Sequence, residues 1–123
     1  MSKRKGELST ARIDREWPHQ VAILDDLCCR ENYWILDAFC RARSASPRAR
    51  SVIAIWPDGK LATFRIYCFQ ERVHAQEFIK AFGGEPFDPS DRAKGRKDTW
   101  FRTDEWRPIL ESGPLRVPDS LRG

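Results

Sequence analysis

Four cysteines are the side chains of this sequence most able to bind a metal ion or to act as nucleophiles. Cys28 and Cys29 are adjacent, while Cys40 and Cys68 lie apart from them along the chain. A zinc knuckle needs two cysteines separated by about two residues on one tight turn, and this spacing does not occur. We therefore expect no metal site and no disulfide, with Cys40 and Cys68 as small core residues.

Two histidines, His19 and His74, could act as general bases or as partners of a cysteine nucleophile. The sequence has no glycine-rich phosphate loop, nucleophile elbow or paired carboxylate motif to accompany them. His74 lies beside the apolar stripe of an expected helix, which is a common place for a half-buried histidine. We therefore expect a protein that is not an enzyme and that needs no cofactor.

Basic side chains form three clusters that could contact the phosphates of a nucleic acid. The 123 residues include 22 lysines and arginines against 18 acidic residues, a net charge of +4. This mild excess permits RNA or DNA as a partner without demanding it, because charged loops are also ordinary solvated surface. The three clusters are Lys3, Arg4 and Lys5; Arg41, Arg43, Arg48 and Arg50; and Arg92, Lys94, Arg96 and Lys97.

The elements that must position these clusters are organised around residues 51–84. The segment WPDGK lies between two apolar runs, and Pro57, Asp58 and Gly59 favour a type I turn with a bulge. The sequence therefore predicts a β-hairpin at this point.

A helix is predicted directly after the hairpin. Apolar side chains recur there at the spacing of one helix face, and the pattern ends at Gly83 and Gly84. We expect this face to pack across the hairpin. It consists of Ala75, Phe78, Ile79 and Phe82.

Further elements precede and follow this unit. Residues 17–24 favour a short buried strand, residues 31–43 favour a helix, and DTWFR at residues 98–102 favours a last strand. This order predicts an α+β fold, a ferredoxin-like βαββα(β) sandwich with two helices on one antiparallel sheet.

One compact core is expected, because a chain of this length supports a single hydrophobic core. Residues 17–110 form the predicted single α+β domain, between a polar flexible N-terminus at residues 1–16 and a C-terminal tail at residues 111–123. The predicted core residues are Ile35, Leu36, Phe39, Val52, Ala54, Phe64, Ile66, Phe78, Ile79 and Phe82.

The predicted strand at residues 61–69 offers two different faces. We expect the more apolar face to be buried, which leaves Arg65 and Tyr67 outward, where a base could stack on the ring. The spacing from Phe69 to Ala75 also suits the opposite register. The face expected to be buried carries Ala62, Phe64, Ile66 and Cys68. Alternatively, the outward face is covered by three C-terminal aromatic residues, Trp100, Phe101 and Trp106.

Residues 64–84, FRIYCFQERVHAQEFIKAFGG, resemble the third strand and second helix of RNA-recognition-motif domains. The resemblance implies an RNA-binding sheet face with Arg65 and Tyr67 as contacts. The strand signature of that family also contains a glycine, which residues 61–69 lack.

The whole chain also resembles a group of small bacterial proteins. The shared stretches are KRKGEL at residues 3–8, WPHQV at residues 17–21 and FGGEPFDP at residues 82–89. This resemblance implies no activity, site or cofactor, and it favours a stand-alone cytoplasmic protein.

Two hypotheses about function follow. The first is a small non-enzymatic protein that contacts nucleic-acid phosphates through basic loops while Arg65 and Tyr67 meet bases. The second is a protein–protein interaction or adaptor domain that uses an exposed sheet face or the tryptophan-rich C-terminal segment. No stretch is apolar enough for a membrane span or a secretion signal, so we expect a cytoplasmic protein without a membrane partner. The patterns carry no information on oligomeric state.

Overall fold

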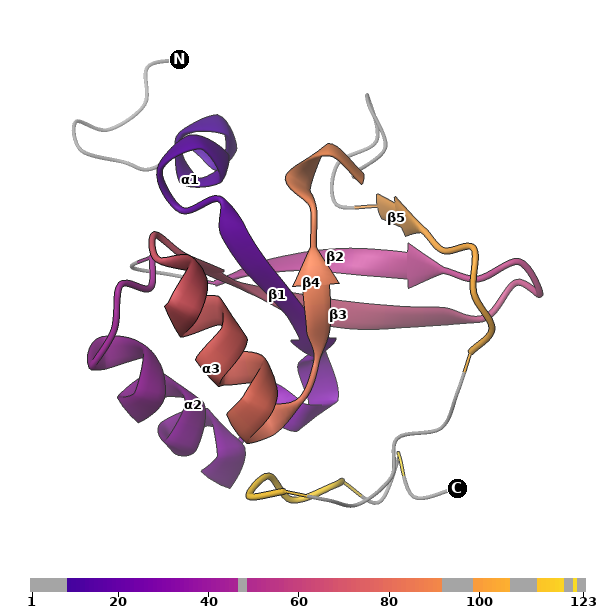
Figure 1. Ribbon diagram of the computed structural model, residues 1–123. Coiled ribbons are helices and arrows are strands. Elements are labelled where there is room, and N and C mark those ends of the chain that lie inside the picture. The colour runs from indigo at the N-terminus through magenta and orange to yellow at the C-terminus, as the bar shows by residue number, and fades with distance from the viewer. Residues whose placement is uncertain (1–8, 47–48, 92–98, 107–112, 119–120, 122–123) are drawn as a thin grey trace, which may run out of the picture.

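The computed structural model describes residues 9–46, 49–91, 99–106, 113–118 and 121. Within these residues, three α-helices and two short 3-10 helices accompany one five-stranded sheet, so the predicted α+β class is confirmed (Figure 1). None of the described helices is both long and apolar enough to cross a bilayer. The elements in chain order are α1 (Thr10–Glu16), β1 (His19–Leu24), η1 (Asp25–Cys28), α2 (Glu31–Arg41), β2 (Arg50–Ile55), β3 (Leu61–Phe69), α3 (Arg72–Phe82), β4 (Glu85–Phe87), η2 (Pro89–Asp91) and β5 (Thr99–Phe101).

The five strands pair in the spatial order β4-β1-β3-β2-β5. Three neighbouring pairs are antiparallel: β4 with β1, β1 with β3, and β3 with β2. The fourth pair differs, because β5 runs parallel to β2. The sheet is therefore mixed, and the prediction of a purely antiparallel sheet is wrong. The difference arises because the chain passes from β4 at one edge to β5 at the other edge, where it runs in the direction of β2.

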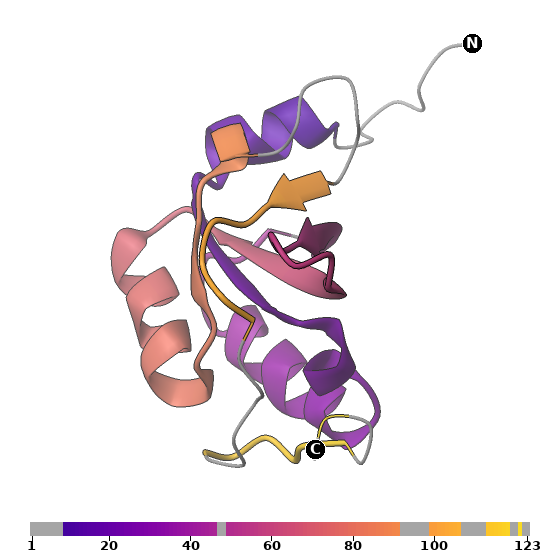
Figure 2. The same ribbon diagram turned by 90° about the vertical axis from the view of Figure 1, so that its right-hand side faces the viewer.

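The sheet curls until its two edge strands meet across one face (Figure 2). The ring centroid of Phe87 in β4 lies 5.0 Å from that of Trp100 in β5. Directly after β5, Arg102 Nη2 lies 2.8 Å from Oε1 of Glu85 in β4. The face enclosed in this way also carries Phe64, and we call it the concave face.

The predicted hairpin between β2 and β3 is confirmed. Trp56 N donates to Lys60 O at 2.9 Å, and Gly59 N donates to Trp56 O at 2.9 Å. Gly59 has φ +88°, the left-handed conformation that the bulged turn requires. The Asp58 carboxylate also accepts a hydrogen bond from Lys60 N at 3.0 Å, so the turn is closed by its own residues.

The opposite face of β3 is covered by α3. The ring of Phe78 lies 5.1 Å from that of Tyr67 and 5.8 Å from that of Phe69, measured between centroids. α2 packs beside α3, with the ring of Phe39 5.7 Å from Phe78. The prediction that the helix packs on the Phe64 face of β3 is therefore wrong, because α3 covers the Tyr67 face. Side-chain alternation could not decide this, since both faces of the last half of β3 are apolar and buried.

Most of the predicted core is confirmed. Ile35 is exposed, so its prediction as a core residue is wrong. Leu36 takes the inward position of α2, and the side chain of its neighbour Ile35 points about 100° away around the helix. Three predicted residues are half-buried against the core: Phe39, Ile79 and Phe82. The buried ones are Leu36, Val52, Ala54, Phe64, Ile66 and Phe78.

A helix, α1, occupies residues 10–16, where the sequence predicts a flexible N-terminus. The Ser9 side chain caps the helix by accepting a backbone N–H of its first turn. Ile13 is buried, and Asp14 Oδ1 lies 2.7 Å from Arg50 Nη1 of β2. Residues 10–16 therefore belong to the packed structure, while residues 1–8 lie outside the described part of the chain.

Residues 113–118 also pack against the domain, although a tail is predicted there. The side-chain amide of Asn32 in α2 accepts from Arg116 N at 3.0 Å and donates to Arg116 O at 2.8 Å. Leu115 and Val117, the residues on either side of Arg116, are buried. Paired hydrogen bonds from one amide thus hold this segment in place, and it adds two apolar side chains to the core.

Candidate binding cavity

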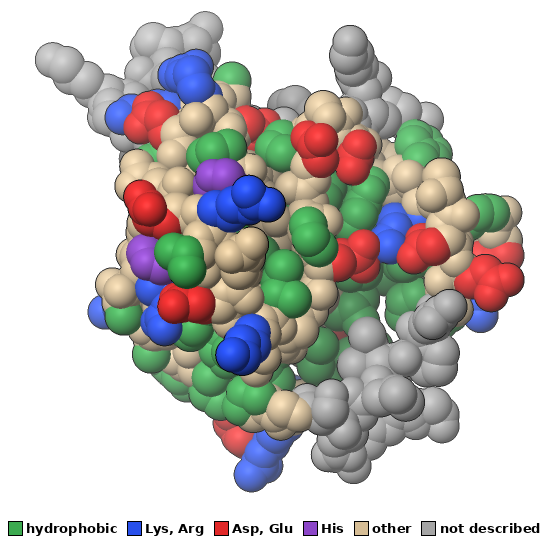
Figure 3. Space-filling view, viewed as in Figure 1, with side chains coloured by type: hydrophobic (Ala, Val, Ile, Leu, Met, Phe, Trp, Pro, Cys, Tyr) green, Lys and Arg blue, Asp and Glu red, His purple; other side chains and the backbone are tan. Residues whose placement is uncertain are grey.

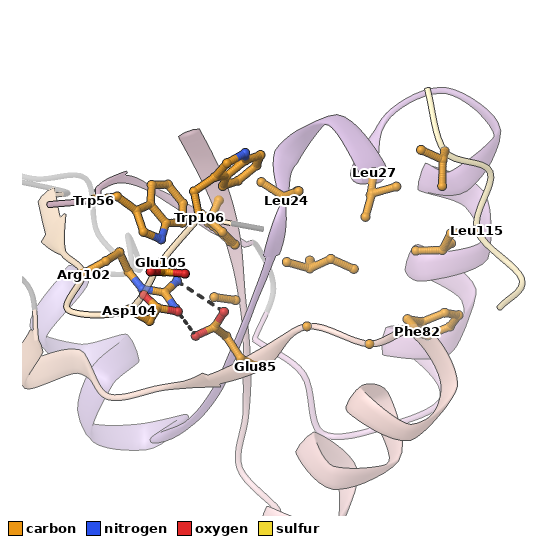
Figure 4. A pocket seen from close by; sticks show the side chains of 16 residues that line it. Leu24, Leu27, Trp56, Phe82, Glu85, Arg102, Asp104, Glu105, Trp106 and Leu115 are labelled. Atoms are coloured by element: carbon orange, nitrogen blue, oxygen red, sulfur yellow. Dashed lines mark hydrogen bonds and ion pairs between the residues drawn. The ribbon is translucent and has the colours of Figure 1, made fainter. Parts of the chain in front are cut away.

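A cavity of about 440 Å³ opens at the concave face (Figure 4). Its walls come from β1, the start of β4, the hairpin turn, and the segments after β5 and before the C-terminus. Figure 3 shows the surface hollowed beside β4, where acidic, basic and hydrophobic side chains meet. The side chains labelled at its aromatic and charged end are Trp56, Glu85, Arg102, Asp104, Glu105 and Trp106.

Arg102 is the central charged group of this end. Its side chain is only 8% exposed, and its Nη2 atom lies 2.8 Å from Glu85 Oε1 and 2.7 Å from Asp104 Oδ2. A second nitrogen, Nη1, donates to Glu85 Oε2 at 3.2 Å, so Glu85 binds the guanidinium through both oxygens. The guanidinium carbon also lies 4.2 Å from the ring centroid of Trp100, a cation–π distance. Carboxylates and an aromatic ring therefore fix Arg102 in place.

The lining of this end carries more negative than positive charge. Glu85, Asp104 and Glu105 contribute three carboxylates against the single guanidinium of Arg102, which leaves two negative charges in excess. Glu105 makes no hydrogen bond or ion pair within the described residues. Because the surrounding walls are low-dielectric protein, this excess attracts a cation more strongly than the same carboxylates would on a flat surface.

The indole of Trp56 contributes a hydrogen-bond donor that the described residues do not use. Trp56 is 4% exposed, and its buried Nε1 atom has no acceptor among them. Figure 4 shows this nitrogen turned toward the cavity, on the side of Glu105. A buried N–H without a partner costs about 1–3 kcal/mol. An acceptor that enters the cavity would therefore be stabilised here.

The other end of the cavity is aliphatic and aromatic without charge. Leu27 of η1 lies at this end with Leu115 of the C-terminal segment and Phe82 of α3, while Leu24 of β1 lies nearer Trp106 (Figure 4). These side chains can cover the apolar part of a ligand. The cavity thus combines an apolar end with an anionic end that also offers one donor.

The predicted nucleic-acid contacts are only partly within the described chain. Arg41 is exposed and pairs with Asp37 at 2.9 Å on its own helix. Arg43 lies over the Phe39 ring at 3.5 Å and pairs with Glu77 at 3.0 Å, which ties α2 to α3. Eight predicted contacts lie outside the described residues: Lys3, Arg4, Lys5, Arg48, Arg92, Lys94, Arg96 and Lys97.

The remaining predicted contacts are engaged inside the fold. Arg50 and Arg65 are paired with Asp14 and Asp25, at 2.7 Å and 2.9 Å. Tyr67 is 9% exposed beneath α3, so a base cannot stack on its ring, and the prediction that it points outward is wrong. Burial also raises the pKa of the Tyr67 hydroxyl, which keeps it neutral at physiological pH.

The cysteines sit in different environments and form no disulfide. Cys28 and Cys68 are buried, Cys40 is half-buried and Cys29 is exposed. Burial raises the pKa of the Cys28 and Cys40 thiols from 9.0 to about 12. Both are therefore protonated and poorly nucleophilic at neutral pH. Among the described residues, no three His, Cys, Asp or Glu side chains gather as a metal-binding group.

His74 forms a hydrogen-bonded link between α2 and α3. Its Nδ1 atom accepts from Ser44 N at 3.1 Å and lies 2.8 Å from Ser44 Oγ. Ser44 Oγ in turn accepts from Glu71 N at 3.0 Å, just before α3. This arrangement holds the loop after α2 against the start of α3, so the histidine has a structural role.

A second candidate surface lies on the same sheet face that α3 covers, but at the end of β2 and β3 that is away from the helices. Ile53, Leu61 and Phe101 are exposed there. Ile55 pairs with both Leu61 and Phe101, so these side chains share one face near the hairpin turn. Figure 1 shows α2 and α3 at the opposite end of β2 and β3. This is an exposed sheet face of the kind that the adaptor hypothesis names as one of its two possible contact surfaces.

Sequence reasoning missed the residues at the charged end of the cavity. One signal was available in TWFRTDEW, because Trp100 and Arg102 are two residues apart on an extended segment and so share a face. Glu85 gives no such signal, since it meets Arg102 only through the curl of the sheet. The predicted cover by C-terminal aromatic rings exists, but Trp100 packs against Phe64 on the concave face, at 5.5 Å between centroids.

Comparison of the chain with protein-family models, with curated proteins and with solved structures finds no match.

Proposed function

We propose that this protein is a non-enzymatic interaction module that binds a segment of a partner protein in the concave cavity. The observation that carries the proposal is the buried Trp56 Nε1 donor, turned into an open cavity and without an acceptor among the described residues. A polypeptide supplies a carbonyl acceptor at every residue, so an extended segment always has one to offer this donor.

The dimensions and composition of the cavity support a peptide ligand. A volume of about 440 Å³ lies in the range of sites that hold a few side chains. Trp56, Trp106 and Arg102 line it, and tryptophan and arginine are the residue types most enriched at energetically important interface positions. The aliphatic end, with Leu27 and Leu115, offers a place for an apolar side chain of the partner.

No arrangement of side chains in the described residues favours catalysis. The buried thiols are protonated, and the Ser44–His74 contact lies at a backbone link between two helices and not in the cavity. A binding role therefore accounts for the cavity with fewer assumptions than an enzymatic one.

The nucleic-acid hypothesis receives less support from the described residues. Arg43, Arg50 and Arg65 are each paired with an acid of the chain, and Tyr67 is buried. The cavity itself carries excess negative charge, which repels phosphate.

Selection from a displayed library of short random peptides tests the proposal. Peptides enriched on the protein should lose binding to Trp106→Ala, which removes one cavity wall. They should keep binding to Trp34→Ala, a matched control in which a tryptophan 69% exposed on α2 is removed away from the cavity. We expect the loss to exceed about tenfold, the effect of truncating an aromatic side chain at the centre of an interface.

Two results would contradict this function. One is the absence of enriched peptides, and the other is enrichment that Trp34→Ala abolishes and Trp106→Ala leaves intact. Labelled single-stranded and duplex oligonucleotides, titrated at several salt concentrations, form the comparison arm. Salt-dependent oligonucleotide binding without peptide binding would favour the nucleic-acid hypothesis instead.

We also propose that the architecture is ferredoxin-like with one added strand. The order β4-β1-β3-β2 and the helices between β1 and β2 and between β3 and β4 support this assignment, with β5 as the addition. A cytoplasmic location is proposed as well, and the four cysteines without a disulfide agree with a reducing compartment.

A further inference from the structure

We infer that the cavity selects a partner segment with a lysine or arginine side chain, whose cation lies at the anionic end beside Glu105. This inference rests on the proposed function, because it specifies the chemistry of the segment that the cavity binds.

The cavity holds negative charge that Arg102 does not neutralise. Arg102 already makes three contacts of 3.2 Å or less with Glu85 and Asp104, so both of its terminal nitrogens are bound by these two carboxylates. Glu105 borders the same cavity and makes no ion pair within the described residues. A cation that enters would therefore meet Glu105 together with the uncompensated part of the Glu85 and Asp104 charge.

The aromatic rings give a second reason to expect a cation. Arg102 shows how this end of the cavity stabilises one, since its guanidinium carbon lies 4.2 Å from the Trp100 ring centroid and 5.3 Å from that of Trp56. Trp106 lies against Trp56 at 5.0 Å between centroids and is only half-buried. Its ring is thus available to the alkyl stem and the charged head of a basic side chain.

The unused hydrogen-bond donor of Trp56 distinguishes a basic peptide from a simple metal ion or amine as the ligand. Trp56 Nε1 needs an acceptor, yet the net negative charge of the lining disfavours a carboxylate or a phosphate there. A neutral peptide carbonyl satisfies the donor without adding negative charge. A lysine or arginine residue supplies this carbonyl and the cation together.

The indole N–H resonances of the nitrogen-15-labelled full chain provide a direct test. The probe is acetyl-Leu-Lys-Leu-amide, compared with the same peptide carrying norleucine or glutamate in place of lysine. We expect the lysine peptide to shift the Trp56 resonance, assigned with Trp56→Phe, and to bind about tenfold more tightly than the norleucine peptide. The glutamate peptide should bind most weakly, and the lysine advantage should shrink as salt is added.

A charge-matched pair of variants locates the effect. Glu105→Gln should reduce the preference for lysine over norleucine at least threefold, about the effect of one partly exposed ion pair. Asp58→Asn, which removes an exposed acid of the hairpin turn outside the cavity, should leave the preference unchanged. Circular dichroism of both variants checks that the fold is retained.

Several outcomes would overturn the inference. Equal binding of the lysine and norleucine peptides would do so while leaving the proposed function intact, and so would tighter binding of the glutamate peptide. If none of the three peptides shifts the Trp56 resonance, the inference fails. The proposed function fails only if the library selection also yields no cavity-dependent peptide.

Discussion

Two aromatic clusters lie on opposite faces of the same sheet, and their chemistry differs. The Phe78 cluster, under α3, has hydrocarbon rings and one tyrosine at its centre, and a cation, Arg43, lies only at its rim, over the half-buried Phe39 ring. The Arg102 cluster, on the concave face, surrounds a guanidinium that two carboxylates bind. The rings around Phe78 belong to Phe39, Tyr67, Phe69 and Phe82. Those around Arg102 belong to Trp56, Phe64 and Trp100.

The difference supports the proposal that the Phe78 cluster is core and that the Arg102 cluster borders a binding site. Hydrocarbon rings pack edge to face with no polar requirement, so the centre of the Phe78 cluster is sealed, with Phe78 0% exposed. Its outer rings, Phe39 and Phe82, are half-buried. A cation among rings is stable only where carboxylates reach it, so the Arg102 cluster must lie next to solvent-accessible acids. The open cavity, the Trp56 donor and the excess acids all occur on that side. Departures from core rules of this kind are expected where a protein binds something.

The largest effect that we expect comes from opening the sealed cluster. Phe78→Ala should lower the free energy of unfolding by about 3–5 kcal/mol, because it removes the ring that joins α3 to α2 and to β3. Phe101→Ala, which truncates an exposed ring in β5, should change stability by less than about 0.5 kcal/mol. Urea denaturation of both variants measures the difference. Equal costs would mean that burial beneath α3 adds no stability over exposure at the other end of the same sheet face.

Removal of the central cation of the other cluster should have an intermediate effect. Arg102→Met should lower the free energy of unfolding by about 1–2 kcal/mol. The cost is smaller than for a fully buried pair because the side chains of Glu85 and Asp104 are 41% and 55% exposed, and water replaces part of the lost interaction. Tryptophan fluorescence should change as well, since the guanidinium no longer lies over Trp100.

The control for this prediction is an arginine whose ion pair is exposed on a helix. Arg12→Met removes a pair with Glu16 at 2.7 Å, and we expect a cost below about 0.5 kcal/mol. If Arg102→Met costs no more than Arg12→Met, the ion pair between Glu85 of β4 and Arg102, the residue after β5, does not stabilise the curl of the sheet.

The two clusters also differ in how far the sequence could predict them. The β-hairpin and α3 were predictable because Gly59, Gly83 and the apolar stripe that includes Phe78 are local signals. The face that α3 covers was not, since both Phe64 and Tyr67 of β3 are buried and side-chain alternation gave no preference.

The cavity and α1 required contacts between distant parts of the chain. Residues 10–16 contain a single apolar side chain that is buried, Ile13, and the helix is held by the pairing of Asp14 with Arg50, a residue predicted to contact phosphate. The Arg102 cluster likewise depends on a parallel pairing of β5 with β2, and short-range patterns do not report which edge a last strand joins.

The smallest effect on stability at neutral pH is expected for substitutions of the cysteines beside the Phe78 cluster. Their reaction with a thiol reagent tests whether this side of the sheet excludes water. Cys29 is exposed and should react with a thiol reagent in the native protein, whereas Cys28 should react only as fast as the structure opens. Cys29→Ser should remove the fast phase and change stability by less than about 0.5 kcal/mol. Cys28→Ser should leave the fast phase in place. A fast-labelling thiol that is lost in Cys28→Ser would show that Cys28 is accessible, which distinguishes it from the half-buried Cys40.

The same thiols predict the direction of the pH dependence. Burial raises the pKa of Cys28 and Cys40 from 9.0 to about 12 in the folded state, so the folded chain retains protons that the unfolded chain releases above pH 9. The unfolded state then binds fewer protons, and the free energy of unfolding must fall as pH rises. We expect stability to be unaffected by these groups below pH 9 and to decline from pH 9 toward 12, with a shallower decline in Cys28→Ala. Denaturation midpoints at pH 8 and pH 10 check this, and equal midpoints would mean that water reaches the thiols and that the Phe78 side of the sheet is not sealed.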